Sequence, residues 1–303
     1  MYKIIKTRRL AENVVEFVVD APRVTVNARP GQFIILRIDE EGERLPFTIC
    51  DMDKGRGTVT ILVQSIGYST KKLCAMKAGG FLVDFVGPLG HPTDLTGYNK
   101  VLMIGGGIGA AVVYPQAKFL KAQGKAADVI VGARNKALIM YEKQFKAAAG
   151  KLYITTDDGS YGEKGFVTDV LRRLLDVKED NHAACHGDTV PDLACRETCP
   201  HDPAAVRQRY DVVFAVGPMP MMRAVCGVTG EYGVKTIVSM NSIMVDGTGM
   251  CGCCRVTAGG EIKYACVDGP EFDGHLIDWD EAINRGKNFV EIEKEHLCRL
   301  KNL

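Results

Sequence analysis

The sequence predicts an antiparallel β-barrel, then a doubly wound α/β domain with a parallel sheet, and finally a small cysteine-rich segment. Three observations support this fold class. The first hundred residues hold several short apolar or alternating runs. Strand, glycine turn and helix patterns repeat from Lys100 onwards. Four cysteines then gather in "DGTGMCGCCRVTAGGEIKYAC", residues 246–266. We therefore expect domains at residues 1–98, 99–240 and 241–303.

Composition agrees with a globular protein of this size. The 303 residues are 46% hydrophobic and 25% charged, which is enough for two domains with real cores. Lys and Arg number 38 against 37 Asp and Glu, so the net charge of +1 predicts neither nucleic acid nor a membrane as partner. The opening "MYKIIKTRRL" lacks the apolar core of a signal peptide, and the eleven cysteines are odd in number and clustered late. We expect a cytoplasmic protein with reduced thiols.

The first hundred residues read as barrel strands. "NVVEFVVD", "QFIILRID" and "GTVTILVQSI" are alternating, apolar or β-branched runs bounded by turn residues. Pro46 forces Leu45 into an extended conformation. Ser69 or Thr70 is expected to cap a helix that starts near Lys71 and presents free amides to phosphate.

Three glycine-containing turns follow apolar strands in the second part. "VLMIGGGIGA" allows backbone amides to approach a pyrophosphate, and Pro115 is expected to mark the start of the following helix. "VIVGARNK" has no acidic residue for the usual ribose contact, and a tight turn without ligand is the alternative. Asp157 and Asp158 in "TTDDGSYGEKG" are candidates for ribose hydroxyls or for turn formation. With "VGPMPMM", these turns are expected to meet at one crevice.

A polar stretch at about 179–209 interrupts this pattern and reads as an insertion. Its cysteines and histidines are candidates for a metal site, with an exposed loop as the alternative. These residues are His182, Cys185, His186, Cys195, Cys199 and His201. From Trp279 onwards the charged sequence is typical of a helical tail, broken or capped at Gly286.

The cysteine spacing predicts an iron-sulfur cluster. Plant-type two-iron clusters use C-x4-C-x2-C and a later fourth cysteine. Cys251, Cys254 and Cys266 match three of those positions, and Asp246 stands at the first. A carboxylate can bind ferric iron as an anionic oxygen donor, so three sulfurs and one oxygen are a reasonable ligand set. The competing set replaces Asp246 with Cys253, and structural zinc or unliganded thiols remain the alternatives.

Several motifs occur in the order typical of one family: "RLPFTI", "GYSTKKL", "GPLG", "GGGIG", "DDGSYGEKGFVTDVL", "VGPMPMM" and "CVDGPEFDGHLIDW". In these the chain resembles the ferredoxin-NADP reductase superfamily, and within it the branch with a C-terminal two-iron cluster. It is similar to the small subunits of NADH-dependent reduced ferredoxin:NADP+ oxidoreductases, also described as sulfide dehydrogenase small subunits. The electron-transfer subunits of dihydroorotate dehydrogenase are similar too, but carry cysteine where this chain has Asp246.

The resemblance implies a six-stranded barrel that binds FAD. Pro46, Phe47 and Thr48 would contact the isoalloxazine, and the hydroxyls of Ser69 and Thr70 the pyrophosphate. One departure is that the family arginine stands three residues before the hydroxyl residue, whereas here Leu45 takes that place and Arg44 lies one residue earlier. The implied FAD-binding residues are Arg44, Leu45, Pro46, Phe47, Thr48, Leu62, Val63, Gln64, Gly67, Ser69, Thr70 and Gly87.

The resemblance also implies that the second domain binds NAD(H). Arg134 and Lys136 leave NADP(H) possible, since basic residues there can pair with a 2′-phosphate. The implied contacts are Gly106, Gly107, Ile108, Gly109, Asp157, Asp158, Gly159, Gly217, Pro218 and Met219.

The function implied is electron transfer. NADH would deliver a hydride to FAD, and a [2Fe-2S] cluster would pass single electrons to a larger flavin and iron-sulfur subunit in a heterodimer. Ferredoxin would react through that complex, which would split electron pairs between acceptors. No acid or base is required, so no catalytic residue is nominated. The alternatives are the electron-transfer subunit of an NAD-dependent dihydroorotate dehydrogenase, and a non-catalytic nucleotide-binding module with structural zinc.

Overall fold

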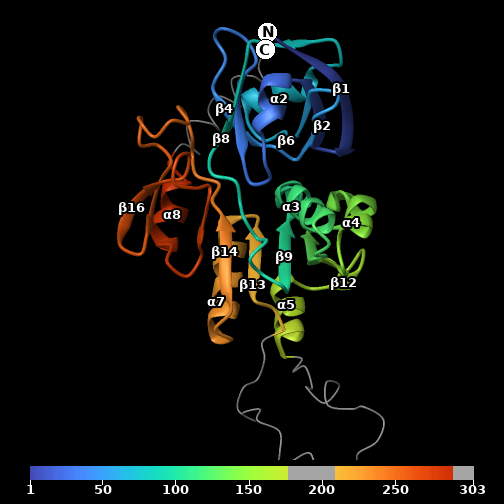
Figure 1. The fold of residues 1–303 in the computed structure, drawn as a ribbon, viewed down its shortest axis with the longest axis vertical. Coiled ribbons are helices and arrows are strands. Elements are labelled where there is room, and N and C mark those ends of the chain that lie inside the picture. The colour runs from blue at the N-terminus through green and yellow to red at the C-terminus, as the bar shows by residue number, and fades with distance from the viewer. Residues whose placement is uncertain (177–208, 289–303) are drawn as a thin grey trace, which may run out of the picture.

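The computed structural model describes residues 1–176 and 209–288 and shows a β-rich part, a parallel α/β part and a cysteine-rich part (Figure 1). The cysteines and histidines proposed for a metal site in the insertion fall outside the described residues, as does the tail after residue 288. The predicted fold class is confirmed.

The first part is a barrel built from a five-stranded and a three-stranded sheet. Both sheets enclose one apolar core, in which Phe17, Ile34 and Phe85 are fully buried. The resemblance implied six strands; the described residues form eight, of which β5 and β7 are very short. In sheet order the strands are β5 (Asp51–Asp53), β6 (Thr58–Gln64), β2 (Val14–Asp20), β1 (Tyr2–Ala11) and β7 (Phe81–Leu82), then β4 (Leu45–Thr48), β3 (Phe33–Arg37) and β8 (Asp84–Leu89).

Two helices accompany the barrel, α1 (Pro22–Asn27) and α2 (Tyr68–Ala75). Helix α2 begins three residues earlier than predicted, with Gly67 as its N-cap, so Ser69 and Thr70 lie in its first turn. The prediction was wrong because Thr70 acts at the third helical position. Its hydroxyl accepts hydrogen bonds from the backbone N–H groups of Ile66 and Gly67, each at 3.0 Å.

The second part is a seven-stranded sheet. Helices α3 and α4 pack together, α5 and α7 pack together, and the two pairs belong to separate apolar cores. In sheet order the strands are β12 (Glu163–Lys164), β11 (Leu152–Thr156), β10 (Asp128–Ala133), β9 (Val101–Gly106), β13 (Val212–Val216), β14 (Lys235–Ser239) and β17 (Glu271–Asp273). The helices are η1 (Gly107–Gly109), α3 (Ala110–Ala122), η2 (Lys136–Leu138), α4 (Glu142–Ala148), α5 (Val167–Asp176) and α7 (Met219–Glu231).

Pro115 does not mark the start of a helix, contrary to the prediction. Helix α3 begins at Ala110, directly after η1, and holds Pro115 as a buried residue in its second turn. Ala110, Ala111 and Val113 are buried in an apolar core together with residues of β9, and this burial extends the helix ahead of the proline.

The cysteine-rich part contains a hairpin of β15 (Arg255–Ala258) and β16 (Glu261–Tyr264), and then helix α8 (Trp279–Arg285). The Asp278 carboxylate caps α8 by accepting a hydrogen bond from the Glu281 N–H at 2.9 Å, and Gly286 ends it as expected. Strand β17 pairs antiparallel with β14 and so becomes the edge of the α/β sheet. The domain boundaries at 98/99 and 240/241 stay predictions.

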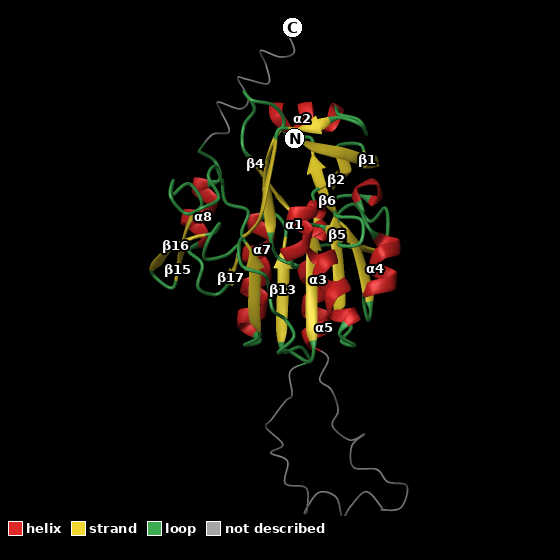
Figure 2. Cartoon of the chain, turned by 45° about the horizontal axis from the view of Figure 1, so that its top comes forward, coloured by secondary structure: helices red, strands yellow, loops and turns green. Residues whose placement is uncertain are grey.

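The barrel sits over the carboxyl ends of the parallel strands (Figures 1 and 2). Polar contacts join the two parts. The Tyr141 hydroxyl donates to the Glu16 carboxylate at 2.8 Å, and Arg8 holds the same carboxylate through two further bonds. Lys118 on α3 pairs with Asp51 on β5 at 2.7 Å. No helix of the described residues is both long and apolar enough to cross a membrane.

Candidate functional site

The predicted nucleotide turns meet at one edge of the parallel sheet. Gly106 at the end of β9 lies opposite Gly132 of β10, and Gly105 lies opposite Val216 of β13. The chain leaves β9 for β10 and β11 on one side and returns through β13 on the other. Ligands in such sheets bind beyond the carboxyl ends of the strands at this reversal point.

The first and third turns touch backbone to backbone. A Cβ at Gly109 would lie 2.3 Å from the Val216 carbonyl oxygen, and one at Gly217 only 3.2 Å from the Gly106 Cα. Gly107 has a φ of +56° and faces open space. The site therefore exposes backbone to a ligand at Gly107, as a phosphate contact requires. Ile108 is half-buried beside it, and Pro218 and Met219 begin α7.

The second turn is held to the end of β10. The Asp157 and Asp158 N–H groups donate to the Ala133 and Arg134 carbonyls at 3.1 and 3.2 Å. Ser160 binds the Asp158 carboxylate and lowers its pKa, mainly through the serine hydroxyl. Asp158 thus shapes the turn, which ends at the exposed Gly159, whereas the exposed Asp157 carboxylate can face a ribose.

The predicted flavin strand β4 is the outer strand of its sheet. Leu45, Pro46, Phe47 and Thr48 are all half-buried. Leu45 and Phe47 pack against the barrel core, whereas Pro46 and Thr48 alternate with them on the other face of the strand, where a bound ligand would cover them. The Arg44 guanidinium donates a hydrogen bond to the Asp246 carbonyl at 3.2 Å. Its phosphate contact stays a prediction.

The other predicted flavin residues divide into exposed backbone and packed side chains. Gly67 faces open space at the start of α2, whose first N–H groups have no partner within the helix. The Ser69 hydroxyl donates to the Glu43 carboxylate at 2.6 Å, so it is already engaged. Leu62 and Val63 are buried in cores, which leaves their backbone and the half-buried Gln64 for a ligand.

Gly87 has a packing role. A Cβ there would lie 2.7 Å from Ile34 Cγ2, so the glycine lets β8 approach β3 closely.

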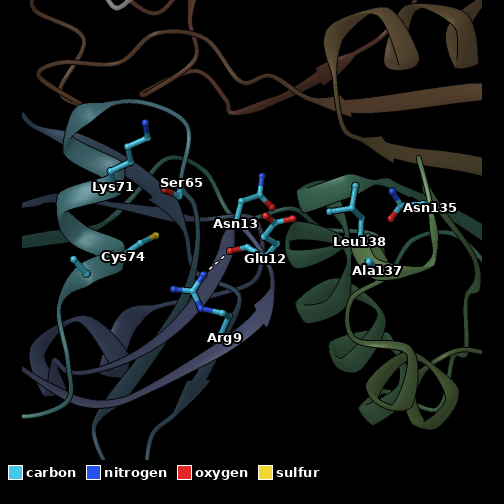
Figure 3. A pocket seen from close by; sticks show the side chains of 10 residues that line it. Arg9, Glu12, Asn13, Ser65, Lys71, Cys74, Asn135, Ala137 and Leu138 are labelled. Atoms are coloured by element: carbon cyan, nitrogen blue, oxygen red, sulfur yellow. Dashed lines mark hydrogen bonds between the residues drawn. The ribbon is translucent and has the colours of Figure 1, made fainter. Parts of the chain in front are cut away.

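A cavity of about 630 Å³ lies between the barrel and the α/β part (Figure 3). Its walls come from the β1–β2 turn, the end of β6, helix α2 and the loop after β10. None of the predicted cofactor residues lines it. Asn13, Lys71 and Asn135 in these walls were not predicted from the sequence, because single polar residues outside a motif have no characteristic spacing. The nearest residues that the sequence singled out are Arg134 and Lys136, on either side of Asn135.

The cysteines form two neighbouring pairs. Cys254 and Cys266 are buried with their sulfurs 3.2 Å apart. Two thiolates on one tetrahedral metal lie about 3.7 Å apart, given metal–sulfur bonds of about 2.3 Å. Burial raises the pKa of the Cys266 thiol to about 12, so a metal is needed to hold it as thiolate at neutral pH. Cys251 is exposed, and its hydrogen bond raises the pKa of the Cys253 thiol.

Among residues 1–176 and 209–288, no three His, Cys, Asp or Glu side chains converge as a single ion would require. A two-iron cluster needs two protein ligands on each iron, and the buried pair Cys254 and Cys266 can supply the two for one iron.

Both candidates for the fourth ligand lie near Cys251. The Cys253 amide is the largest influence lowering the pKa of the Cys251 thiol, and the Asp246 amide acts in the same direction. The Asp246 carboxylate accepts hydrogen bonds from the Thr248 hydroxyl and, at 3.1 Å, from its N–H. Both go to Oδ2, and a carboxylate has a second oxygen that can bind iron. The Asp246 carboxylate therefore stabilises the local turn through Oδ2 and still has Oδ1 to bind a metal.

The cysteine loop rests directly on the barrel. A Cβ at Gly247 would lie 2.5 Å from Ile35 Cδ1 and 3.0 Å from Leu89 Cδ1, so only glycine fits there, with a φ of +83°. Ile35 on β3 pairs with Pro46 on β4. The cysteine loop and the flavin motif thus belong to one contact region.

The comparisons with known proteins agree with this arrangement. Residues 241–278 match the model for the iron-sulfur cluster binding domain of dihydroorotate dehydrogenase B. The chain is 41% identical, over 96% of its length and 93% of the relative's, to a dihydroorotate dehydrogenase B (NAD(+)) electron transfer subunit homolog of Thermotoga maritima.

Solved structures extend the comparison. A chain of the NADH-dependent reduced ferredoxin-NADP oxidoreductase is 39% identical, with a TM-score of 0.83 and 98% of each chain covered. Phthalate dioxygenase reductase, at 15% identity and a TM-score of 0.58 over 85% of each chain, shares the fold. With relatives this similar along almost the whole sequence, the chain belongs to the family of dihydroorotate dehydrogenase B electron-transfer subunits and their homologues, within the ferredoxin-NADP reductase superfamily.

Proposed function

We propose that this chain is a flavin and iron-sulfur electron-transfer subunit that oxidises NADH and passes single electrons to a larger partner subunit. The partner belongs to a complex that couples NADH, NADP+ and ferredoxin by splitting electron pairs, and it works in the cytoplasm, where thiols stay reduced. The full-length similarity to the NADH-dependent ferredoxin-NADP oxidoreductase supports this choice of complex.

The observation that carries the proposal is the close packing of Gly247 against the side chains of Ile35 and Leu89. It brings the cysteine loop against the sheet that contains β4, the strand of the flavin motif. Arg44, which precedes that strand, also binds the Asp246 carbonyl of the loop. A short path between the two cofactor regions is what transfer of single electrons requires.

The residues fit the two cofactors. Strand β4, with Leu45, Pro46, Phe47 and Thr48, and the open amides at Gly67 would hold FAD. Cys251, Cys254 and Cys266 with Asp246 would hold the cluster. FAD accepts the two electrons of a hydride together and releases them singly, and the [2Fe-2S] cluster carries one at a time.

The protein's own task at the dinucleotide is positioning. Gly106, Gly107 and Gly109 present backbone to the pyrophosphate, and Asp157 faces the ribose beside Asp158 and Gly159. Gly217, Pro218 and Met219 close the crevice from β13. This edge of the sheet faces the barrel, so the nicotinamide end can be directed at the flavin motif (Figure 1).

The partner would dock around the cysteine loop. Met250 is 89% exposed, and Val245 and Val267 nearby are also exposed apolar side chains. Cys251 is exposed between them along the chain. Apolar groups at a point of electron exit favour a protein partner that covers them.

The experiment is an anaerobic absorbance and paramagnetic-resonance spectrum of the purified chain before and after NADH. Wild type should show flavin bleaching and a reduced-cluster signal. Cys251→Ser should keep NADH-dependent bleaching and lose the cluster signal, because the variant lacks a ligand but leaves the nucleotide sites intact. Cys253→Ser is the matched control and should retain both if Asp246 is the fourth ligand. A colourless wild-type protein, or one that holds zinc alone, contradicts the proposal.

The family finding also supports a second function, in which electrons from a dihydroorotate-oxidising partner reach NAD+ through this chain. Asp246 argues against it, since the resemblance places cysteine there in that branch. Purification of the native complex decides between them: orotate formation in the purified complex establishes the second function, and NADH-dependent and ferredoxin-dependent reduction of NADP+ the first.

A further inference from the structure

Helix α8 holds an arginine against the cysteine loop. The helix packs on β15, where the Glu281 carboxylate accepts a hydrogen bond from the Thr257 hydroxyl, and its Ala282 is buried (Figure 1). Arg285 is the last residue of the helix and is half-buried. Its Nη2 donates a hydrogen bond to the Cys253 carbonyl at 3.2 Å. The guanidinium is therefore fixed between the end of α8 and the loop.

The positive charge of Arg285 is not neutralised by a neighbouring carboxylate. Glu281 stands four residues earlier, which is the spacing of an ion pair on a helix, but its carboxylate turns to β15 and lies 3.5 Å from Arg255. Arg223 on α7 pairs with Asp280 at 2.8 Å. In the described part of the chain Arg285 has no such partner, so its charge can act on the loop that it touches.

A second, small cavity of about 140 Å³ lies beside Arg285. Cys253 and Arg255 line it from the cysteine-rich part, and Met219 lines it from the start of α7. Sites for small molecules and cofactors usually start at about 300 Å³. A nucleotide does not fit this cavity, and the polar group that Arg285 binds is the loop carbonyl.

That carbonyl belongs to the peptide that joins Cys253 to Cys254, a proposed cluster ligand. Because a peptide unit is planar, fixing its carbonyl also fixes the direction of the Cys254 N–H. A hydrogen bond from a charged donor is about twice as strong as one between neutral groups. Hydrogen bonds and net charge around the sulfurs help to set the reduction potential of an iron-sulfur cluster. Arg285 can therefore act on the potential through both the peptide and its charge.

We infer that Arg285 is a positioning residue that orients the Cys253–Cys254 peptide and, through its positive charge, raises the reduction potential of the cluster. The inference rests on the proposed function. Transfer of one electron oxidises the reduced flavin by one electron and adds one negative charge at the cysteine loop. A fixed cation stabilises this added charge and so favours transfer towards the loop. Arg44 also binds a loop carbonyl, but it is exposed and solvent screens its charge more.

The test is an anaerobic redox titration of the full-length chain, followed by the paramagnetic-resonance signal of the reduced cluster, together with iron analysis. Arg285→Gln removes the charge but keeps an amide N–H for the carbonyl. It should retain its iron and favour the oxidised cluster about tenfold more than wild type, which lowers the potential by about 59 mV for one electron. Arg285→Lys keeps the charge and should stay close to the wild-type potential.

Arg223→Gln is the matched control, because it also removes an arginine bound to α8, one that pairs with Asp280 and not with the loop. It should keep the wild-type potential. The inference is overturned if Arg285→Gln holds its cluster at the wild-type potential, or if Arg285→Lys shifts the potential as far as Arg285→Gln does.

The lysine variant also decides if Arg285→Gln loses its iron. A cluster at the wild-type potential in Arg285→Lys would then support the role of the charge. Loss of iron from both variants would show that Arg285 only holds the loop in place, and would overturn the inference. A wild-type chain without iron would instead refute the proposed function.

Discussion

Asp246 and Cys253 are the two candidates for the fourth cluster ligand. The backbone amide of each lies near Cys251 and lowers the pKa of its thiol. We predict that Asp246→Ala loses most of its iron, because it removes the carboxylate proposed as the fourth cluster ligand. Asp246→Cys should retain a cluster with a changed paramagnetic-resonance spectrum, since a thiolate replaces an oxygen ligand. Iron content and spectrum after anaerobic purification measure both.

Thr248→Val is the control for Asp246, since it removes the hydroxyl that binds the carboxylate but keeps the carboxylate itself. Full iron content and an unchanged spectrum in Asp246→Ala would move the ligand role to Cys253.

A second residue, Glu271 on β17, makes stability depend on pH. Its Oε2 accepts a hydrogen bond from the Thr93 hydroxyl, and its Oε1 is buried without a partner among the described residues. Burial raises the pKa of Glu271 from 4.5 to about 8. Since the folded pKa lies above the unfolded one, the stabilising effect is complete below about pH 4.5 and is lost as the pH rises to about 8. The slope in that window is at most about 1.4 kcal/mol per pH unit.

Glu271→Gln should therefore be more stable than wild type at pH 8 and should flatten the pH dependence. Thermal unfolding between pH 5 and 8 measures this, with Glu261→Gln, on an exposed residue of β16, as the control. Parallel pH profiles for wild type and Glu271→Gln would show that the carboxyl is already ionised in the folded protein.

At the scale of elements, two glycines of the α/β part should respond to alanine in opposite ways. Gly109→Ala would place a Cβ 2.3 Å from the Val216 carbonyl oxygen, a backbone atom that no rotamer change can move. We expect a loss of about 1–3 kcal/mol in unfolding free energy and a raised KM for NADH. Gly227→Ala, inside α7 and facing open space, should gain about 0.5–1 kcal/mol.

Denaturant unfolding and NADH titration of both glycine variants check this. Equal stability of the two variants would mean that the β9 turn can move away from β13 without cost.

Most elements could be predicted from the sequence, because apolar runs such as those of β2, β9 and β13 have a strong period and clear turn boundaries. The start of α2 was misplaced because Thr70 can cap or act at the third helical position, and sequence alone does not separate these roles. The start of α3 was wrongly predicted at Pro115, because burial of the residues before it, which the sequence pattern does not show, decides where the helix begins.

The parts of the candidate site that lie in sequence motifs could be predicted, whereas contacts between segments far apart in the chain could not. The glycine turns and cysteines have fixed spacing, whereas the bond between Arg44 and Asp246 and the pairing of β17 with β14 join residues far apart in the chain. Asn13 and Asn135, which are 122 positions apart, carry no pattern at all.

At the scale of the whole molecule, one buried hydrogen bond joins the barrel to the α/β part. The Tyr141 hydroxyl donates to Glu16, which also binds Arg8. Tyr141→Phe should cost about 1.5–3 kcal/mol, the usual contribution of a hydrogen bond to a charged group. Tyr114→Phe is the control, since Tyr114 packs on the Tyr141 ring through its own ring. Chemical unfolding measures both, and equal losses would show that the ring contact, not the hydroxyl, joins the two parts.

Strand β17 has a practical consequence for anyone who wishes to produce the flavoprotein alone. Cutting the chain before residue 241 would strip β14 of its neighbour and leave a row of unsatisfied backbone groups open to solvent. Such an edge invites copies of the shortened chain to pair with one another. The shortened protein should therefore precipitate or form polymers. Cluster binding is better abolished by point substitution of the cysteines than by deletion of this part of the chain.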